Sequence, residues 1–225
     1  MRRRYSSPRS GSRSTAIVFI ALMLGMLLMA VVGSALAEGS IPANAKRYQR
    51  TLMREAQAHW GLNAPVARFA AQIHQESGWR ITAKSRYADG LAQFTPSTAE
   101  WIAEIYPAHL ANAAPYSPQW AIKALVIYDK YLFDHIQPQH AGLMDECDRW
   151  AMALSAYNGG LGWVNRDRRL TTANGDDPDR WFGNVENHTQ RADWARDENR
   201  RYPQRILCIL EPRYLRQHWF GEPEC

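Results

Sequence analysis

The stretch VARFAAQIHQESGWR, residues 66–80, decides the fold expected for this chain. Phe69 and Ile73 recur at the spacing of an amphipathic helix, and Gly78 predicts where that helix ends. Glu76 comes three residues after Ile73 and seven after Phe69, so it lies on the same face as these apolar side chains. A carboxylate on a buried helix face costs free energy unless it is paired, protonated or used. Glu76 is therefore the first candidate functional residue.

Further helices are expected on both sides of this one. They are predicted at 43–60, at 94–106 with Pro96 in the first turn and a capping box from Ser97 to Glu100, at 118–136, at 148–158 before Gly159 and Gly160, and at 198–210 with Pro203 in its first turn or at a kink. The polar stretch from Asn165 to about Arg196 is predicted to be mostly loop. Because no convincing period-2 strand pattern appears, the sequence predicts a mainly α fold.

The first 37 residues have the pattern of an export signal. Five arginines and no acidic residue open the chain, an uncharged apolar run follows from Thr15 to Ala37, and the run ends in the small residues ALA. This pattern predicts a signal peptide cleaved before Glu38. An uncleaved anchor in the inner membrane stays open, because about 20 apolar residues can span a bilayer. Residues 38–225 are predicted to form one domain, exported to the periplasm or cell wall.

The net charge of +5 suggests at first an acidic partner such as nucleic acid. Removing the five arginines of the leader from the 27 basic residues leaves 22, which equals the 22 acidic residues, all of which follow the leader. The exported part is formally neutral, so no nucleic-acid partner is predicted.

The three cysteines, Cys147, Cys208 and Cys225, predict one disulfide and one remaining thiol in an oxidising compartment. The pairing does not follow from the sequence, although the terminal position of Cys225 makes it the expected free cysteine. Their spacing matches no metal motif, and His135 and His140 are expected to be ordinary surface histidines. We predict no metal and no cofactor.

Two further motifs carry polar side chains suited to binding a sugar. In DGLAQFTP, residues 89–96, the amide of Gln93 can orient a hydroxyl or an N-acetyl group. In SAYNGG, residues 155–160, Tyr157 and Asn158 arrive at the end of a helix and can project into a cleft. Each motif alone also fits an ordinary loop or a helix end.

A later pair adds to this set. Glu198 and Tyr202 are four residues apart and therefore share a helical face. Trp79 and Trp163 lie beside motifs and are candidates for stacking on sugar rings.

Read in order, QESGW, a serine at Ser85, GLAQF.P, AYNGG and E...YP resemble the lytic transglycosylases of the soluble, goose-lysozyme-like kind. The resemblance covers about residues 62–207. It implies an α-rich lysozyme-like fold and, as substrate, glycan strands of peptidoglycan cut between N-acetylmuramic acid and N-acetylglucosamine. It implies that Glu76 is the catalytic acid and base. It also implies supporting or substrate-binding roles for Ser77, Gln93, Tyr157, Asn158 and Tyr202, the last of which is expected to form a hydrogen bond near Glu76.

The sequence departs from the family pattern in three places. Ala92 replaces a methionine of the loop, and Arg80 and Ile81 replace the asparagine and proline often found after the aromatic residue. Asp89 stands where a small residue is more usual. If its side chain reached the cleft, it could activate water as a second carboxylate and make the protein a hydrolytic muramidase. A turn aspartate before Gly90 is the preferred interpretation.

Other hypotheses remain beside the enzyme. A peptidoglycan-binding module without activity and a membrane-tethered protein both fit parts of the sequence. The same motifs serve phage lysis, wall remodelling and secretion machines, among which a phage or prophage endolysin fits the export leader slightly better.

Overall fold

A computed structural model describes residues 40–140, 142, 144–223 and 225. The predicted signal peptide or signal anchor, residues 1–37, lies outside these described residues. Among the helices that are described, none combines the length and the apolar character needed to cross a bilayer.

The described chain is built from helices. They are α2 (Ala45–Trp60), α3 (Val66–Ser77), α4 (Pro96–Ile105), α5 (Pro107–Leu110), α6 (Pro118–His135), α7 (Glu146–Gly159), α8 (Leu161–Ala173), the 3₁₀ turn η1 (Val185–Asn187), α9 (Asp193–Arg205), the π-helical turn η2 (Ile206–Leu210) and α10 (Glu211–Arg216). Within this part of the chain, β pairing is limited to two isolated bridges, Lys84 with Asp89 and Asp89 with Phe94. The mainly α prediction is confirmed.

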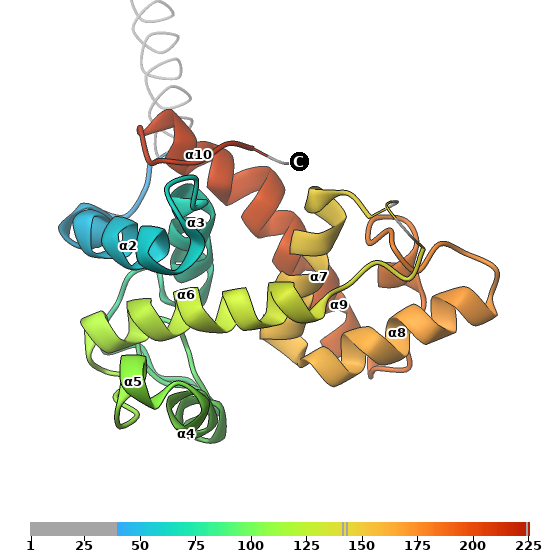
Figure 1. The fold of residues 1–225 in the computed structure, drawn as a ribbon, viewed down its shortest axis with the longest axis horizontal. Helices are drawn as coiled ribbons and strands as arrows, with labels where there is room; N and C mark the ends of the chain where they lie inside the picture. The colour runs from blue at the N-terminus through green and yellow to red at the C-terminus, as the bar shows by residue number, and fades with distance from the viewer. Residues whose placement is uncertain (1–39, 141, 143, 224) are drawn as a thin grey trace, which may run out of the picture. The chain divides into compact units, whose positions relative to one another are not determined.

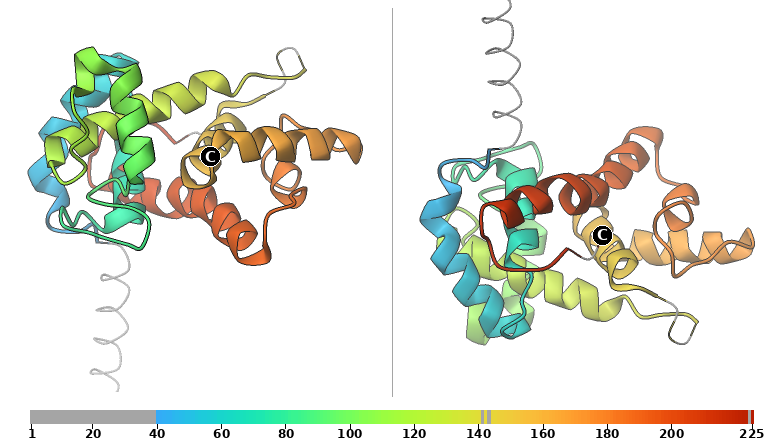
Figure 2. Two further views of the ribbon diagram at one scale, coloured as in Figure 1. Left: turned by 90° about the horizontal axis from the view of Figure 1, so that it is seen from below. Right: turned by 90° about the horizontal axis from the view of Figure 1, so that it is seen from above.

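Helix α6 lies at the centre of the helices that come before α7. It packs against α2, while α4 and α5 lie on its other side (Figure 1). Helix α9, η2 and α10 follow one another as a long rod along α7 and α3, and both views in Figure 2 show this rod in red. Helix α3 therefore lies between elements from the two halves of the sequence.

The apolar face predicted for 66–77 belongs to the core. Phe69 and Ile73 are fully buried, and the helix runs over the predicted residues before it ends at Gly78. A buried ion pair fastens α3 to α10, since the guanidinium of Arg68 lies 3.0 Å from the carboxylate of Glu211. Both hydrophobic burial and this ion pair therefore fix the helix that carries Glu76.

The turn after α3 depends on Trp79. Gly78 and Trp79 both have positive φ angles, 58° and 64°, which a tryptophan adopts only when its surroundings hold it there. The ring of Trp79 is fully buried, it lies parallel to that of Tyr48, and its indole N–H donates to the hydroxyl of Tyr214 at 2.6 Å. Trp79 therefore anchors the end of α3, and because its ring is fully buried, the prediction that it stacks on sugars is wrong.

Residues 165–196 contain more helix than predicted. Helix α8 runs to Ala173, and α9 already begins at Asp193. The polar side chains of α8 are buried through ion pairs, Asp167 with Arg191 at 3.0 Å and Arg168 with Asp179 at 2.5 Å. A helix that packs through ion pairs shows no apolar stripe, which explains why the periodicity did not reveal it.

Two local predictions also need correction. The N-cap of α4 is Thr95, whose hydroxyl accepts a hydrogen bond from the amide of Thr98 at 3.1 Å, so the box predicted from Ser97 to Glu100 is not used. Of the two places predicted for Pro203, the first turn is wrong, because α9 already begins at Asp193 and Pro203 lies inside it, shortly before the π-helical turn η2. Pro203 has no N–H to donate to the carbonyl of Asn199, so α9 lacks one backbone hydrogen bond there.

The expectation that Cys225 is free is wrong, because Cys225 forms a disulfide with Cys147 and Cys208 is the exposed thiol. After α10 the chain turns back, and the carbonyl of Phe220 accepts a hydrogen bond from the amide of Ala67 at 2.8 Å. This contact directs the C-terminal segment across the start of α3 toward the first turn of α7.

Replacing Cys225 with serine is expected to lower the free energy of unfolding by about 2–4 kcal/mol, since the bridge closes a long loop. Urea denaturation of the oxidised protein measures this loss. Cys208→Ser is the matched control, and an equal effect of the two substitutions would contradict the assigned pairing.

Candidate active site

A cleft of about 760 Å³ opens beside the end of α3. Its floor includes Glu76 and Tyr157. The lining also includes residues of the segment 85–98 and Tyr128 of α6, together with the end of α7, the first turn of α8, and α9 with the residues just before it. The cleft thus brings together side chains from all four motifs that the sequence singled out.

Glu76 is a partly buried carboxyl at the floor of this cleft. Burial is the main cause that raises the pKa of Glu76 to about 8. The hydrogen bond from Tyr202 lowers this pKa, and the negative charge of Glu198 raises it further. At neutral pH the group is therefore largely protonated, and it can act as a proton donor.

Helix α9 supplies the partners of Glu76. The hydroxyl of Tyr202 donates a hydrogen bond to the Glu76 carboxylate, which is the contact that the family resemblance implies. One turn earlier, Glu198 lines the cleft and accepts a long hydrogen bond from the amide of Asn158, at 3.5 Å. Asn199 in turn donates to the Asn158 side chain at 3.1 Å. This network fixes Asn158 at the edge of the cleft.

The loop with Gln93 is held by its own polar groups. Gln93 lines the cleft, but its amide nitrogen donates to the carbonyls of Gly90 and Ala83, at 2.8 and 3.2 Å. The hydroxyl of Tyr157 donates to the carbonyl of Ala92 at 2.7 Å, which ties the loop to α7. The side-chain oxygen of Gln93 is thus the part left for a ligand, and Tyr157 offers its ring.

Two sequence candidates lie outside the cleft lining. Ser77 is only 2% exposed, and its hydroxyl donates to the carbonyl of Ile73 at 3.3 Å, which argues against the substrate contact predicted for it. The carboxylate of Asp89 accepts a hydrogen bond from Tyr116 at 2.5 Å, and Asp89 does not line the cleft either. The second carboxylate that does line it is Glu198.

The structure adds cleft residues that the sequence analysis did not assign. Trp163 lines the cleft as predicted, but Tyr87 and Trp194 line it as well and are 68% and 73% exposed. Trp194 belongs to a stretch interpreted as loop, and Tyr87 follows Ser85 in a turn that no motif emphasised. Exposed aromatic rings at a cleft are a signal for ligand binding, but exposure is not visible in a sequence.

A second buried acid lies behind the site. Asp129 of α6 is fully buried, and the side chain of Gln72, one turn before Glu76 on α3, donates to it at 3.2 Å. Burial raises the pKa of Asp129 well above its usual range; the hydrogen bond from Gln72 opposes this, and the charge of Glu76 adds to it. Burial therefore favours the protonated form of Asp129 in the folded protein.

Asp129→Asn is expected to make the protein more stable at alkaline pH and to leave it unchanged at acidic pH. Because the folded protein holds the proton of Asp129 more tightly than the unfolded chain does, the stability from this group is complete below its unfolded pKa. It is lost as the pH rises through the folded pKa. Asparagine stays neutral throughout. Denaturation curves across pH measure the effect, and equal pH dependence in both proteins would contradict it.

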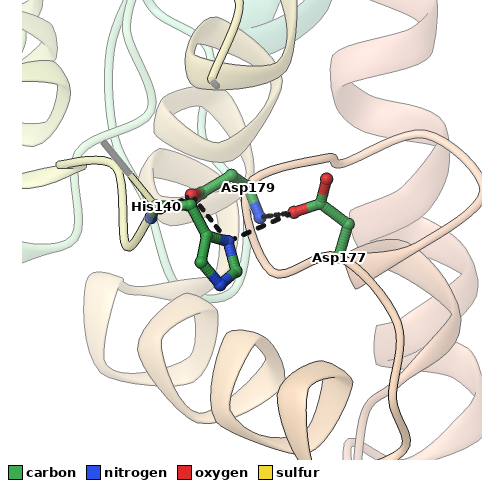
Figure 3. A group of neighbouring side chains, drawn as sticks. All are labelled: His140, Asp177 and Asp179. Carbon is green, nitrogen blue, oxygen red and sulfur yellow. Dashed lines mark hydrogen bonds and ion pairs between the residues drawn. The ribbon is translucent and has the colours of Figure 1, made fainter. Parts of the chain in front are cut away.

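One group of side chains in the described structure has the spacing of a metal site: His140, Asp177 and Asp179 (Figure 3). The carboxylate of Asp179 is already occupied, since it accepts from the amides of Gln139 and His140 and from the guanidinium of Arg168. Asp177 also accepts from the amide of Asp179 at 2.9 Å. These bonds join two loops, and the adjacent arginine disfavours a cation.

Comparison with known proteins places the chain in a family. Residues 51–179, more than half of the chain, match the model of the transglycosylase SLT domain; this range includes Glu76, Gln93, Tyr157 and Asn158 but neither Glu198 nor Tyr202. The chain is also 34% identical, over 114 residues, to the membrane-bound lytic murein transglycosylase F of Pasteurella multocida. That alignment covers 50% of this chain and 21% of its relative, about a fifth of the relative's length. The family that the motifs resembled is confirmed, and the chain belongs to the lytic transglycosylases with an SLT domain.

Proposed function

We propose that this protein is a lytic transglycosylase that cuts the β-1,4 bond between N-acetylmuramic acid and N-acetylglucosamine in peptidoglycan and forms a 1,6-anhydromuramic acid end. The observation that carries the proposal is the partly buried Glu76, whose pKa of about 8 and hydrogen bond from Tyr202 suit it to a proton donor. The name of the relative refers to the same class of reaction on murein.

In the first step, the protonated carboxyl of Glu76 gives its proton to the glycosidic oxygen, and the bond to C1 of the muramic acid breaks. Positive charge develops at C1, where the N-acetyl group of the same sugar can stabilise it. Burial favours this step, because it keeps Glu76 protonated at neutral pH and therefore able to donate its proton to the glycosidic oxygen.

In the second step, the Glu76 carboxylate takes the proton of the C6 hydroxyl, and the C6 oxygen bonds to C1. Tyr202 donates to the carboxylate and therefore stabilises the ionised form between the two steps. The original protonated form is restored and no water is consumed. A single carboxylate is sufficient for this sequence.

Hydrolysis is the alternative outcome, and Glu198 now takes the place proposed for Asp89. Glu198 lines the cleft and is close enough to raise the pKa of Glu76, whereas Asp89 is bound to Tyr116 outside the lining. If Glu198 activated water, the product would carry a reducing end.

Mass spectrometry of fragments released from purified peptidoglycan separates the two reactions. We expect fragments lighter by one water than the corresponding reducing sugars, which identifies the anhydro ring. Fragments with reducing ends would indicate hydrolysis and make Glu198 the candidate second carboxylate. If no fragments were released, a binding module without activity would be favoured.

Trp194→Ala is expected to raise KM for glycan strands about tenfold and to change kcat little, because the exposed ring in the cleft wall offers a platform for a sugar. Steady-state rates of fragment release measure both constants. Trp101→Ala, which removes another exposed tryptophan outside the lining, is the control on short substrates. Unchanged KM in Trp194→Ala would remove this residue from the substrate site.

The proposed substrate, peptidoglycan, requires the protein to be exported. Residues 1–37 act as signal peptide or anchor, and residues 38–225 as the catalytic domain in the periplasm or cell wall. The disulfide between Cys147 and Cys225 is consistent with an oxidising compartment. A phage or prophage endolysin remains the preferred biological role, with wall remodelling and secretion as the alternatives.

A further inference from the structure

Helices α4 and α6 carry a group of aromatic side chains that extends beyond the cleft. We call Trp101, Tyr128, Tyr131 and His135 the α4–α6 aromatic strip. The ring centroid of Trp101 lies 5.9 Å from that of Tyr128 and 5.2 Å from that of Tyr131. The ring centroids of Tyr131 and His135 lie 3.9 Å apart. The strip is therefore one continuous set of ring contacts from two helices.

The strip begins inside the cleft. Tyr128 lines the cleft and contacts the ring of Tyr157 at its floor, 5.3 Å away. Thr98 of α4 also lines the cleft. Trp101 comes three residues after Thr98, and Tyr131 comes three after Tyr128, so both lie about one turn further along the same helix faces. The path from the cleft along α4 and α6 thus leads over these rings.

The chemistry of the strip suits a sugar chain. Trp101 is 36% exposed although burying it would be favourable, and Tyr131 is partly exposed. Aromatic faces pack on the C–H faces of pyranose rings, and tyrosine hydroxyls can bond sugar hydroxyls. The neighbouring Lys130 and Asp134 pair with each other at 2.6 Å, so these two charges offset each other beside Tyr131.

We propose that the α4–α6 aromatic strip binds saccharide units of the same glycan strand outside the catalytic cleft. The occupant is identified by continuity, because a polymer whose sugar lies against Tyr128 must leave the cleft, and the strip continues from that residue. The proposal rests on the proposed function for the identity of the strand. It implies that long strands bind more tightly than short ones, with no change in the chemical step.

The test compares the intact protein with its Trp101→Leu variant on glycan oligomers of two lengths. A short oligomer fills only the cleft, and a long one also reaches the strip. Leucine keeps an apolar side chain at the α4–α6 contact but offers no aromatic face. We expect KM for the long oligomer to rise about fivefold in Trp101→Leu, while KM for the short one and both kcat values stay unchanged. Trp194→Leu, inside the cleft, is the matched control and should raise KM for both lengths.

Equal KM values for the long oligomer in the wild-type protein and Trp101→Leu would overturn the proposal. A similar loss at both lengths would do the same, because it would indicate a structural effect on the cleft. A second substitution, Tyr131→Leu, should reproduce the length dependence if the strip acts as a unit.

Failure of the proposed function would show itself differently, since the wild-type protein would then release no fragments at either length. Co-sedimentation with insoluble peptidoglycan then decides about the strip without requiring cleavage. Weaker binding of Trp101→Leu than of the wild-type protein would support the strip, and equal binding would overturn it.

Discussion

Glu76→Gln is expected to abolish the release of anhydro-ended fragments, with a loss of at least about 10³-fold in kcat. Glutamine keeps the size and the polar character of the side chain but can neither give nor take the proton in either step. In the proposed mechanism the same carboxyl serves both steps, and Asp89 does not line the cleft to replace it. Mass spectrometry of digests of purified peptidoglycan measures the loss, and a reducing-end assay beside it reports any hydrolysis.

The same substitution provides its own control for folding. In the unfolded chain Glu76 ionises near its ordinary pKa, whereas burial raises the folded pKa to about 8. The folded state is therefore penalised as pH rises between these values, and glutamine removes the penalty. We expect Glu76→Gln to be more stable than the wild-type protein at pH 7 by about 1–3 kcal/mol, an estimate reduced for partial exposure. An active variant, or an inactive one that is also unfolded, would contradict the assignment.

Tyr202→Phe and Glu198→Gln are expected to shift the pH dependence of activity in opposite directions. Cleavage needs protonated Glu76, so the rate should fall as pH rises through the pKa near 8. The hydrogen bond from Tyr202 lowers that pKa, and its loss should move the alkaline limb upward. The charge of Glu198 raises the pKa, so its removal should move the limb downward. Shifts of about 0.5–1 pH unit are expected, together with a loss of about 10–100-fold in kcat for Tyr202→Phe, which cannot stabilise the ionised intermediate.

Profiles of kcat/KM between pH 5 and 10 measure both shifts. Asp89→Asn is the matched control, because it removes a carboxylate that does not line the cleft and should leave the alkaline limb in place. Shifts of Tyr202→Phe and Glu198→Gln in the same direction would show that the two residues do not act on Glu76 as described.

The helices with an apolar stripe could be predicted from the sequence, and those without one could not. Helix α3 runs over the predicted residues because Phe69 and Ile73 mark its buried face and Gly78 its end. The part of α8 from Asn165 onward falls in the predicted loop, because the residues it buries include the charged Asp167 and Arg168, which give no apolar stripe. Such a helix is stable only when partners such as Arg191 and Asp179 are brought from elsewhere in the chain.

The motifs determined the family and Glu76 as the candidate acid, because residue types and their order are properties of the sequence. Only the tertiary structure decided which side chains share the cleft. It brings Glu198 and Trp194 into the lining, keeps Asp89 out of it, buries Trp79 and pairs Cys225 with Cys147. The pKa of Glu76 likewise depends on burial and on charges from α9, more than a hundred residues away in the chain. Exposure, pairing and pKa are set by distances between segments, and a local pattern does not contain those distances.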